Sequence, residues 1–86
     1  MELKDTIEMM QSADYRERFK AEYHQTKTRY EKLKAFNNKI EAAHMMKGII
    51  KVQHDCPAPL LREQQTLMGQ YLHILEVRAV IEGIQL

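Results

Sequence analysis

The sequence predicts an all-α protein, a long antiparallel two-helix hairpin that begins with a short helix or an extended arm. Two observations lead to this prediction. Apolar residues recur at helical spacing through two long, charged segments of the 86-residue chain. The glycines and prolines other than Gly69 fall between these segments or near their ends, where helices start and stop. The segment in between, residues 48–56, contains the only alternation of β-branched residues and is predicted to be a linker.

The first long helix is expected over residues 13–47. A seam of residues follows alternating steps of four and three, the spacing with which a helix packs against a partner helix. Asp14 is placed to cap this helix, with Glu17 in capping-box position and Ser12 as a competing cap, and Gly48 can provide the left-handed residue that ends it. The seam consists of Phe19, Tyr23, Thr26, Tyr30, Leu33, Asn37, Ile40 and His44, and its polar members are expected to set the register.

The second long helix is expected over residues 57–85, because proline is tolerated in a first helical turn. Its apolar surface is two stripes wide, whereas a single antiparallel partner covers about one stripe. Gly69, inside this helix, predicts a close crossing by another backbone. One stripe contains Leu60, Leu67, Tyr71, Ile74, Arg78 and Ile81, and the other contains Leu61, Met68, Leu72, Leu75, Ala79 and Glu82.

Residues 1–12 are weakly amphipathic, with Leu3, Ile7 and Met10 at helical spacing. A short helix packed over the hairpin and a frayed N-terminal arm both fit this pattern, and the helix is preferred.

Length and composition restrict the class of protein. A chain of 86 residues, 29% charged and 44% hydrophobic, is expected to form one ordered domain over residues 1–86. Its apolar stretches are far shorter than the roughly 20 residues that span a bilayer, and no secretory leader pattern opens the chain. We therefore expect a soluble, intracellular protein without a membrane partner. The formal net charge of +1 argues against a generic binder of DNA or RNA.

A two-helix hairpin buries little apolar surface, and a core of this size seldom provides more than about 3–5 kcal/mol without further support. The single cysteine excludes an internal disulfide framework, and no metal site is apparent. Oligomerisation remains as the source of support. We expect a helical homo-oligomer whose interface uses the double-width apolar face of the second helix.

The basic residues concentrate on the first helix. Residues 16–39 contain eight basic and three acidic side chains, a net charge of +5. Tyr15 lies off the seam at the mouth of this helix, where its ring can stack on a base while cations and free backbone N–H groups meet phosphate. Tyr15, Arg16, Arg18 and Lys20 therefore form a candidate ligand-binding site. The alternative is a solvated helix face, the usual role of a run of charges.

Arg78 interrupts an apolar stripe between Ile74 and Ile81. An ion pair with Glu76 or with Glu82, one helical turn away, is one explanation for this position. The other explanation is that Arg78 holds a phosphate in a pocket between subunits, and this makes it the fifth candidate site residue.

Nothing in the sequence indicates catalysis. His54, Asp55 and Cys56 are adjacent in the linker, which does not give the geometry of a base and a nucleophile. The four histidines lack ligand spacing on a shared face, and no glycine-rich phosphate loop occurs. We expect a protein that is not an enzyme, with no catalytic residue, metal or cofactor.

Several segments of the chain resemble small phage and prophage proteins that carry the helical-hairpin domain of the anti-CBASS and anti-Thoeris sponges. These segments are DYRERFKAEY (14–23), RYEKL (29–33), DCP (55–57), LL (60–61), MGQYL (68–72) and LEVRAVIEGI (75–84). The resemblance implies a compact helical oligomer, usually a hexamer, in the cytoplasm of an infected bacterial host. Such proteins sequester cyclic di- and trinucleotides or cyclic ADP-ribose isomers, the second messengers of bacterial immunity, without destroying them.

The resemblance also implies nucleotide pockets between protomers. A tyrosine stacks on a base and a lysine lies early in the first long helix. Lys20 occupies the corresponding helix position, and Tyr15 is the nearest tyrosine, at a shorter spacing than in the best-studied branch. An arginine on the second helix contacts phosphate in some members, and Arg78 matches it. The alternative function is a phage accessory or structural helical oligomer without a nucleotide ligand.

Overall fold

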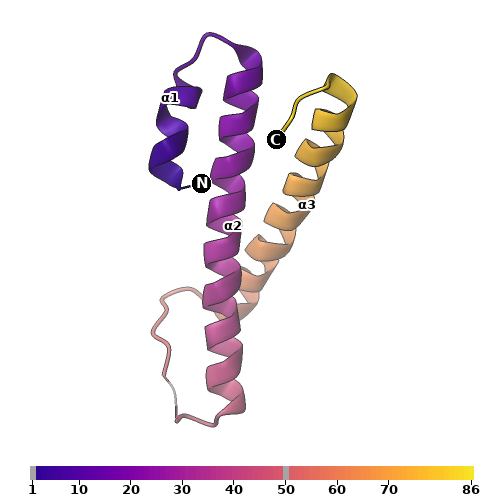
Figure 1. The fold of residues 1–86 in the computed structure, drawn as a ribbon. Helices are drawn as coiled ribbons and strands as arrows, with labels where there is room; N and C mark the ends of the chain where they lie inside the picture. Colours follow the sequence, from indigo (N-terminus) through magenta and orange to yellow (C-terminus); the bar gives the residue numbers. More distant parts are fainter. Residues whose placement is uncertain (1, 50) are drawn as a thin grey trace.

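The computed structural model describes residues 2–49 and 51–86; Met1 in the predicted arm and Ile50 in the predicted linker lie outside the described residues. A short 3-10 helix, η1 (Leu3–Thr6), runs directly into α1 (Ile7–Met10), and two long helices follow, α2 (Tyr15–Met45) and α3 (Ala58–Glu82). Figure 1 shows α2 and α3 as an antiparallel pair, with α1 on the other side of α2. The all-α prediction is confirmed over the described residues, in which no strand occurs.

The ends of α2 are set by the residues that the sequence singles out. Asp14 caps the helix, because its Oδ1 accepts a hydrogen bond from the Arg16 amide at 2.9 Å. Ser12 Oγ accepts in turn from the Asp14 amide at 3.1 Å, so the two competing caps act together. The helix stops two residues before its predicted end. Gly48 has the expected left-handed backbone (φ 87°), but Lys47 already has one (φ 52°), and the chain turns there.

The C-terminus of α3 has the hydrogen bonds of a Schellman motif. Gly83 is left-handed (φ 69°), the Ile84 amide donates to Ala79 O at 2.8 Å, and the Gly83 amide donates to Val80 O at 3.4 Å. The helix therefore ends before residue 83, not at residue 85 as predicted. Pro57 is the residue that precedes its first turn, in agreement with the predicted start.

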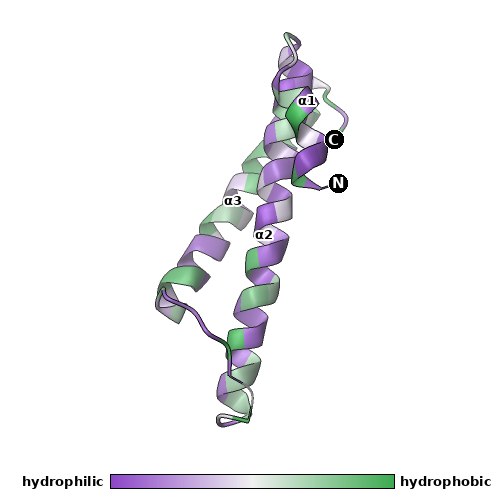
Figure 2. Ribbon diagram, turned by 90° about the vertical axis from the view of Figure 1, so that its left-hand side faces the viewer, coloured by the Kyte–Doolittle hydropathy of each residue, from purple (hydrophilic) through white to green (hydrophobic). Residues whose placement is uncertain are grey.

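The two stripes predicted on the second helix have opposite environments. The inner row, Leu61, Met68, Leu72, Leu75, Ala79 and Glu82, is buried or half-buried at every position. The outer row, Leu60, Leu67, Tyr71, Ile74, Arg78 and Ile81, is exposed at every position. Leu75 is 0% exposed, whereas its neighbour Ile74 is 54% exposed. The single partner helix α2 thus covers one of the two stripes. Figure 2 shows hydrophobic bands along α3 beside a mostly hydrophilic α2.

The inner row of α3 packs against the predicted seam on α2. Every seam residue is buried or half-buried apart from His44, which is exposed because α3 begins above its level. The hydrophobic core lies between the first half of α2 and the second half of α3. It consists of Phe19, Tyr23, Leu72, Leu75, Ala79 and Ile84, with Tyr30 packed against it. None of the helices in the described residues is long and apolar enough to cross a membrane.

Near the start of α3, polar contacts fix the register of α2 against α3. Asn37 Nδ2 donates to Leu61 O at 3.1 Å and to Gln65 Oε1 at 2.9 Å, which ties the seam of α2 to the first turns of α3. A close approach is expected at Gly69, and the nearest atoms there belong to a side chain of α2. A Cβ placed there would lie 3.3 Å from Tyr30 Cε1, so the close neighbour is a tyrosine ring.

Tyrosine hydroxyls also bond to glutamates across the hairpin. Tyr23 Oη donates to Glu76 Oε2 at 2.6 Å, and the Tyr71 hydroxyl donates to the Glu22 carboxylate. Burial, together with the bond to Glu76, raises the pKa of Tyr23 to about 12. The bond to Glu22 raises the pKa of Tyr71 as well. Both phenols therefore remain neutral donors at physiological pH.

The N-terminal segment, η1 and α1, packs on the side of α2 that faces away from α3. Of the two alternatives that the sequence allows, a short helix and a frayed arm, the short helix is the one observed. Thr6 is fully buried and Gln25 Nε2 donates to its Oγ1 at 2.9 Å. Ala21, one turn before Gln25 on the same face of α2, is also 0% exposed. The first half of α2 is thereby covered on two faces, by α3 and by this element.

Candidate functional site

The candidate residues lie at the end of the hairpin where α2 begins and α3 ends. Tyr15 is the first residue of α2, and Arg78 lies one turn before the C-terminus of α3. The antiparallel packing brings these two positions together, although 63 residues separate them in sequence. This end of the molecule is at the top of Figure 1.

Tyr15, Arg78 and Glu82 form a closed cluster of hydrogen bonds, which we call the Tyr15 cluster. Tyr15 Oη donates to Glu82 Oε1 at 2.8 Å and accepts from Arg78 Nη2 at 2.7 Å. Arg78 Nε donates to Glu82 Oε2 at 3.1 Å. The guanidinium carbon also lies 5.1 Å from the centroid of the Phe19 ring, within cation–π distance. The predicted Arg78–Glu82 ion pair is therefore present, and the tyrosine hydroxyl joins it.

The charges of the cluster are well defined. The hydroxyl of Tyr15, assisted by the Arg78 guanidinium, holds the pKa of Glu82 below its usual range. The same hydrogen bond to Glu82 raises the pKa of the Tyr15 phenol. At physiological pH the cluster thus contains a carboxylate, a guanidinium and a neutral hydroxyl. Because the Tyr15 side chain is 46% exposed, a ligand can reach its ring from solvent.

The other candidate residues point to different partners. Arg16 Nη1 donates to Gly83 O at 3.1 Å, which brings it to the same end of α3 as the cluster. Arg18 Nη1 donates to Ser12 O at 3.0 Å, in the turn before α2. Lys20 Nζ lies 3.6 Å from Glu17 Oε1 and is half-buried. The single chain thus brings Tyr15, Arg16 and Arg78 together, whereas Arg18 contacts the turn before α2 and Lys20 contacts Glu17 within α2.

Sequence reasoning missed two members of this arrangement. The pattern places Phe19 in the seam, and Glu82 in a helix stripe and as an ion-pair partner for Arg78, but it assigns neither residue to the ligand site. The four-residue spacing of Arg78 and Glu82 was the available signal, since it places both side chains on one helix face. The contact of Glu82 with Tyr15 depends on the register of two helices, which this spacing does not encode.

In the linker cluster His54–Asp55–Cys56, the histidine ring contacts the backbone of its own segment. His54 Nδ1 lies 2.6 Å from Cys56 O, so this ring nitrogen engages the backbone and not the thiol. The Cys56 thiol is exposed and free. No group of three His, Cys, Asp or Glu side chains within residues 2–49 and 51–86 could hold a metal ion.

Comparison with known proteins gives one match. The family model described as Sequestin matches residues 13–81, which include all of α2 and nearly all of α3. Neither the curated proteins nor the solved structures contain a match.

Proposed function

Because this chain belongs to the Sequestin family, we propose that it binds and sequesters cyclic nucleotide second messengers without cleaving them. The family name indicates a sequestering role, that is, binding and not catalysis. The ligands proposed are cyclic di- or trinucleotides or cyclic ADP-ribose isomers, the class implied by the resemblance to phage immune-evasion sponges. In that role the protein acts in the cytoplasm of the infected bacterial host and uses neither a cofactor nor a membrane or nucleic-acid partner.

The Tyr15 cluster is the observation that carries this proposal. It combines an exposed aromatic ring, a guanidinium and a hydroxyl, the groups with which proteins bind a base and its phosphate. Glu82 already occupies the position of an anion against Arg78 and Tyr15. A phosphate oxygen can take the place of that carboxylate with the same donors. Arg16 and Lys20 supply further positive charge near the N-terminus of α2.

The outer row supports binding between protomers. Arg78 belongs to this row, so subunits that meet through it bring their Tyr15 clusters to the junction. Leu60, Leu67, Met68 and Tyr71, with Glu63 and Gln64, line a mostly apolar groove of about 510 Å³ along it. We propose a homo-oligomer, most consistent with a hexamer in view of the resemblance. The same exposed row also favours the alternative function, an accessory oligomer that binds no nucleotide.

The proposal is tested by calorimetry with a panel of cyclic dinucleotides, cyclic trinucleotides and cyclic ADP-ribose isomers. At least one ligand is expected to bind with a Kd below about 1 μM, which corresponds to about −8 kcal/mol. Heating the complex is expected to release this ligand chemically intact. No heat with any member of the panel would favour the accessory oligomer instead.

Tyr15→Ala and Lys20→Ala are each expected to weaken binding of that ligand by roughly ten- to a hundredfold, because stacking and charge-assisted hydrogen bonds contribute about 1–3 kcal/mol. Their circular dichroism is expected to match that of the wild type, since both side chains are outside the hydrophobic core. Wild-type affinity in both variants would remove these residues from the site.

Glu82→Gln is expected to have the opposite effect and to tighten binding. The ligand phosphate no longer has to displace a carboxylate from Arg78, and an exposed ion pair of this kind is weak. The expected gain is therefore up to about fivefold. Glu31→Gln, at an exposed position in the middle of α2, is the matched control and is expected to leave the Kd unchanged. Weaker binding by Glu82→Gln would mean that the carboxylate contacts the ligand itself.

A further inference from the structure

The opposite end of the hairpin contains a second basic pocket. α3 is shorter than α2, and Asn37 already contacts the first turns of α3. In the last two turns of α2, the side that carries the seam is therefore not covered by α3. The connecting segment runs back beside them instead, as the lower part of Figure 1 shows. A cavity of about 600 Å³ lies between this segment and α2, within the size range of small-molecule sites.

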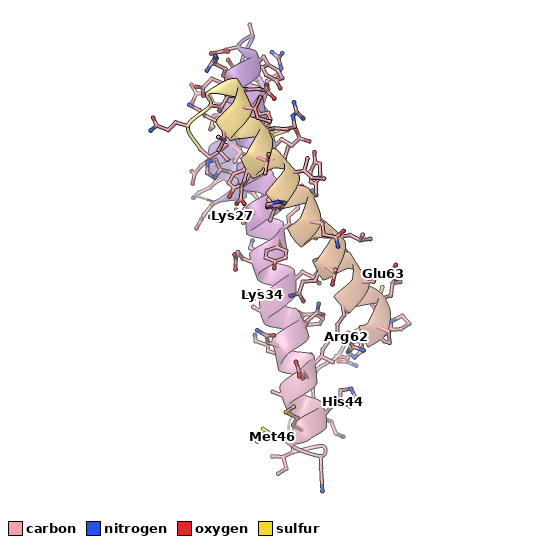
Figure 3. The ribbon with its side chains drawn as sticks, turned by 90° about the vertical axis from the view of Figure 1, so that its right-hand side faces the viewer. Lys27, Lys34, His44, Met46, Arg62 and Glu63 are labelled. Carbon is pink, nitrogen blue, oxygen red and sulfur yellow. The ribbon has the colours of Figure 1, made fainter. Side chains whose placement is uncertain are left out.

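The lining of this cavity combines basic and apolar side chains. Its members are Ile40, Ala43, His44, Lys47, Gly48, Lys51, Val52, Gln53 and His54. Two lysines and two histidines contribute nitrogen donors, and none of these described lining residues is acidic. Ile40 and Val52 provide an apolar wall. Figure 3 shows His44 at this end of the hairpin.

Lys47 and His54 have distinctive local environments. Lys47 is the one non-glycine residue of the described chain with a positive φ, 52°. Such a conformation is disfavoured for a side chain with a Cβ, and strained residues of this kind cluster at binding sites. His54 is fixed by its contact with Cys56 O at 2.6 Å and by an edge-to-face contact with Phe36, whose ring centroid lies 6.4 Å away.

The negative end of the α2 dipole attracts cations and could account for His44 and Lys47. It does not account for Lys51 and His54, which belong to the connecting segment and follow the left-handed turn. Four basic side chains from two different segments thus converge on one cavity that also has an apolar wall.

We propose that this cavity binds a nucleoside diphosphate, with Lys47, Lys51 and the two histidines on the diphosphate and the apolar wall against the nucleoside. A lysine ammonium and imidazole N–H groups suit phosphate oxygens as point donors. This site is separate from the Tyr15 cluster and does not depend on the function proposed for it.

ADP is the probe and adenosine its control. Calorimetry of the full chain is expected to show binding of ADP and at least tenfold weaker binding of adenosine, which lacks the phosphates. Lys51→Glu is expected to weaken ADP binding at least tenfold by charge reversal. Lys39→Glu makes the same charge change at an exposed residue of α2 that does not line the cavity and is expected to leave the affinity for ADP unchanged.

A second pair of measurements separates the two ends of the molecule. Tyr15→Ala is expected to bind ADP like the wild type, and Lys51→Glu is expected to bind the cyclic nucleotide of the proposed function like the wild type. ADP binding that is lost in Tyr15→Ala but retained in Lys51→Glu would place the probe at the Tyr15 cluster and overturn this inference. Equal affinity for adenosine and ADP, or no heat with ADP, would overturn it too. If Lys51→Glu changes the circular dichroism, Lys51→Ala provides the same comparison without a new charge.

Discussion

Leu75→Ala is expected to leave most of the chain unfolded at room temperature. Leu75 is 0% exposed and belongs to the only core cluster found among the described residues. Truncating a buried leucine to alanine costs about 2–5 kcal/mol through lost burial and the cavity left behind. A core of this size seldom provides more than about 3–5 kcal/mol, so the loss is comparable to the whole stability. Urea titration followed by circular dichroism at 222 nm measures the change.

Ile74→Ala is the matched control for this experiment. It removes a similar side chain from the adjacent position, where Ile74 is 54% exposed and faces away from α2. At a protein concentration low enough for monomers, Ile74→Ala is expected to unfold within about 0.5 kcal/mol of the wild type, as surface substitutions usually do. If Leu75→Ala instead has the wild-type unfolding midpoint, the inner row does not form the core.

Ile74→Asp is expected to convert the oligomer into monomers. The outer row is the surface through which we propose that subunits meet, and Ile74 lies near its middle. A carboxylate placed there would be buried without a partner, at a cost of several kcal/mol for each copy. In a closed symmetric assembly the substitution recurs at every interface, so its effect multiplies. Light scattering coupled to size-exclusion chromatography distinguishes the two states.

Gln70→Asp adds the same charge at an exposed position of α3 that belongs to neither row. This variant is expected to retain the wild-type mass. A wild-type protein that remains monomeric at every concentration would contradict both the interface and pockets shared between protomers. An Ile74→Asp variant with the wild-type mass would show that subunits meet elsewhere.

The sequence was sufficient to predict two long helices, the seam on the first and two apolar stripes on the second, but not which of the two stripes faces α2. Heptad spacing from Phe19 to Ile40 depends on helix geometry alone, and the double stripe on the second helix could be identified in the same way. The helix ends were predicted less accurately. Gly48 indicates that α2 ends near this position. Lys47, one residue earlier, already has a left-handed backbone, and residue preferences do not predict this for a lysine.

The candidate site was harder to predict because it is formed by the register between two distant helices. Tyr15, Arg16 and Arg78 were selected for their chemistry, and the structure brings them to one end. The hydrogen bonds of Tyr15 to Glu82, Tyr23 to Glu76 and Tyr71 to Glu22 could not be predicted. Each joins residues that only a known alignment of α2 with α3 would pair.

The opposed surfaces of α3 also restrict how the chain length can vary. Each residue inserted into a helix turns everything beyond it by about 100°. A single insertion between Met68 and Leu72 would therefore rotate Leu75 and Ala79 out of contact with α2 and turn other side chains inward. Natural variants of this protein should therefore carry their insertions and deletions outside α3, which keeps a constant length.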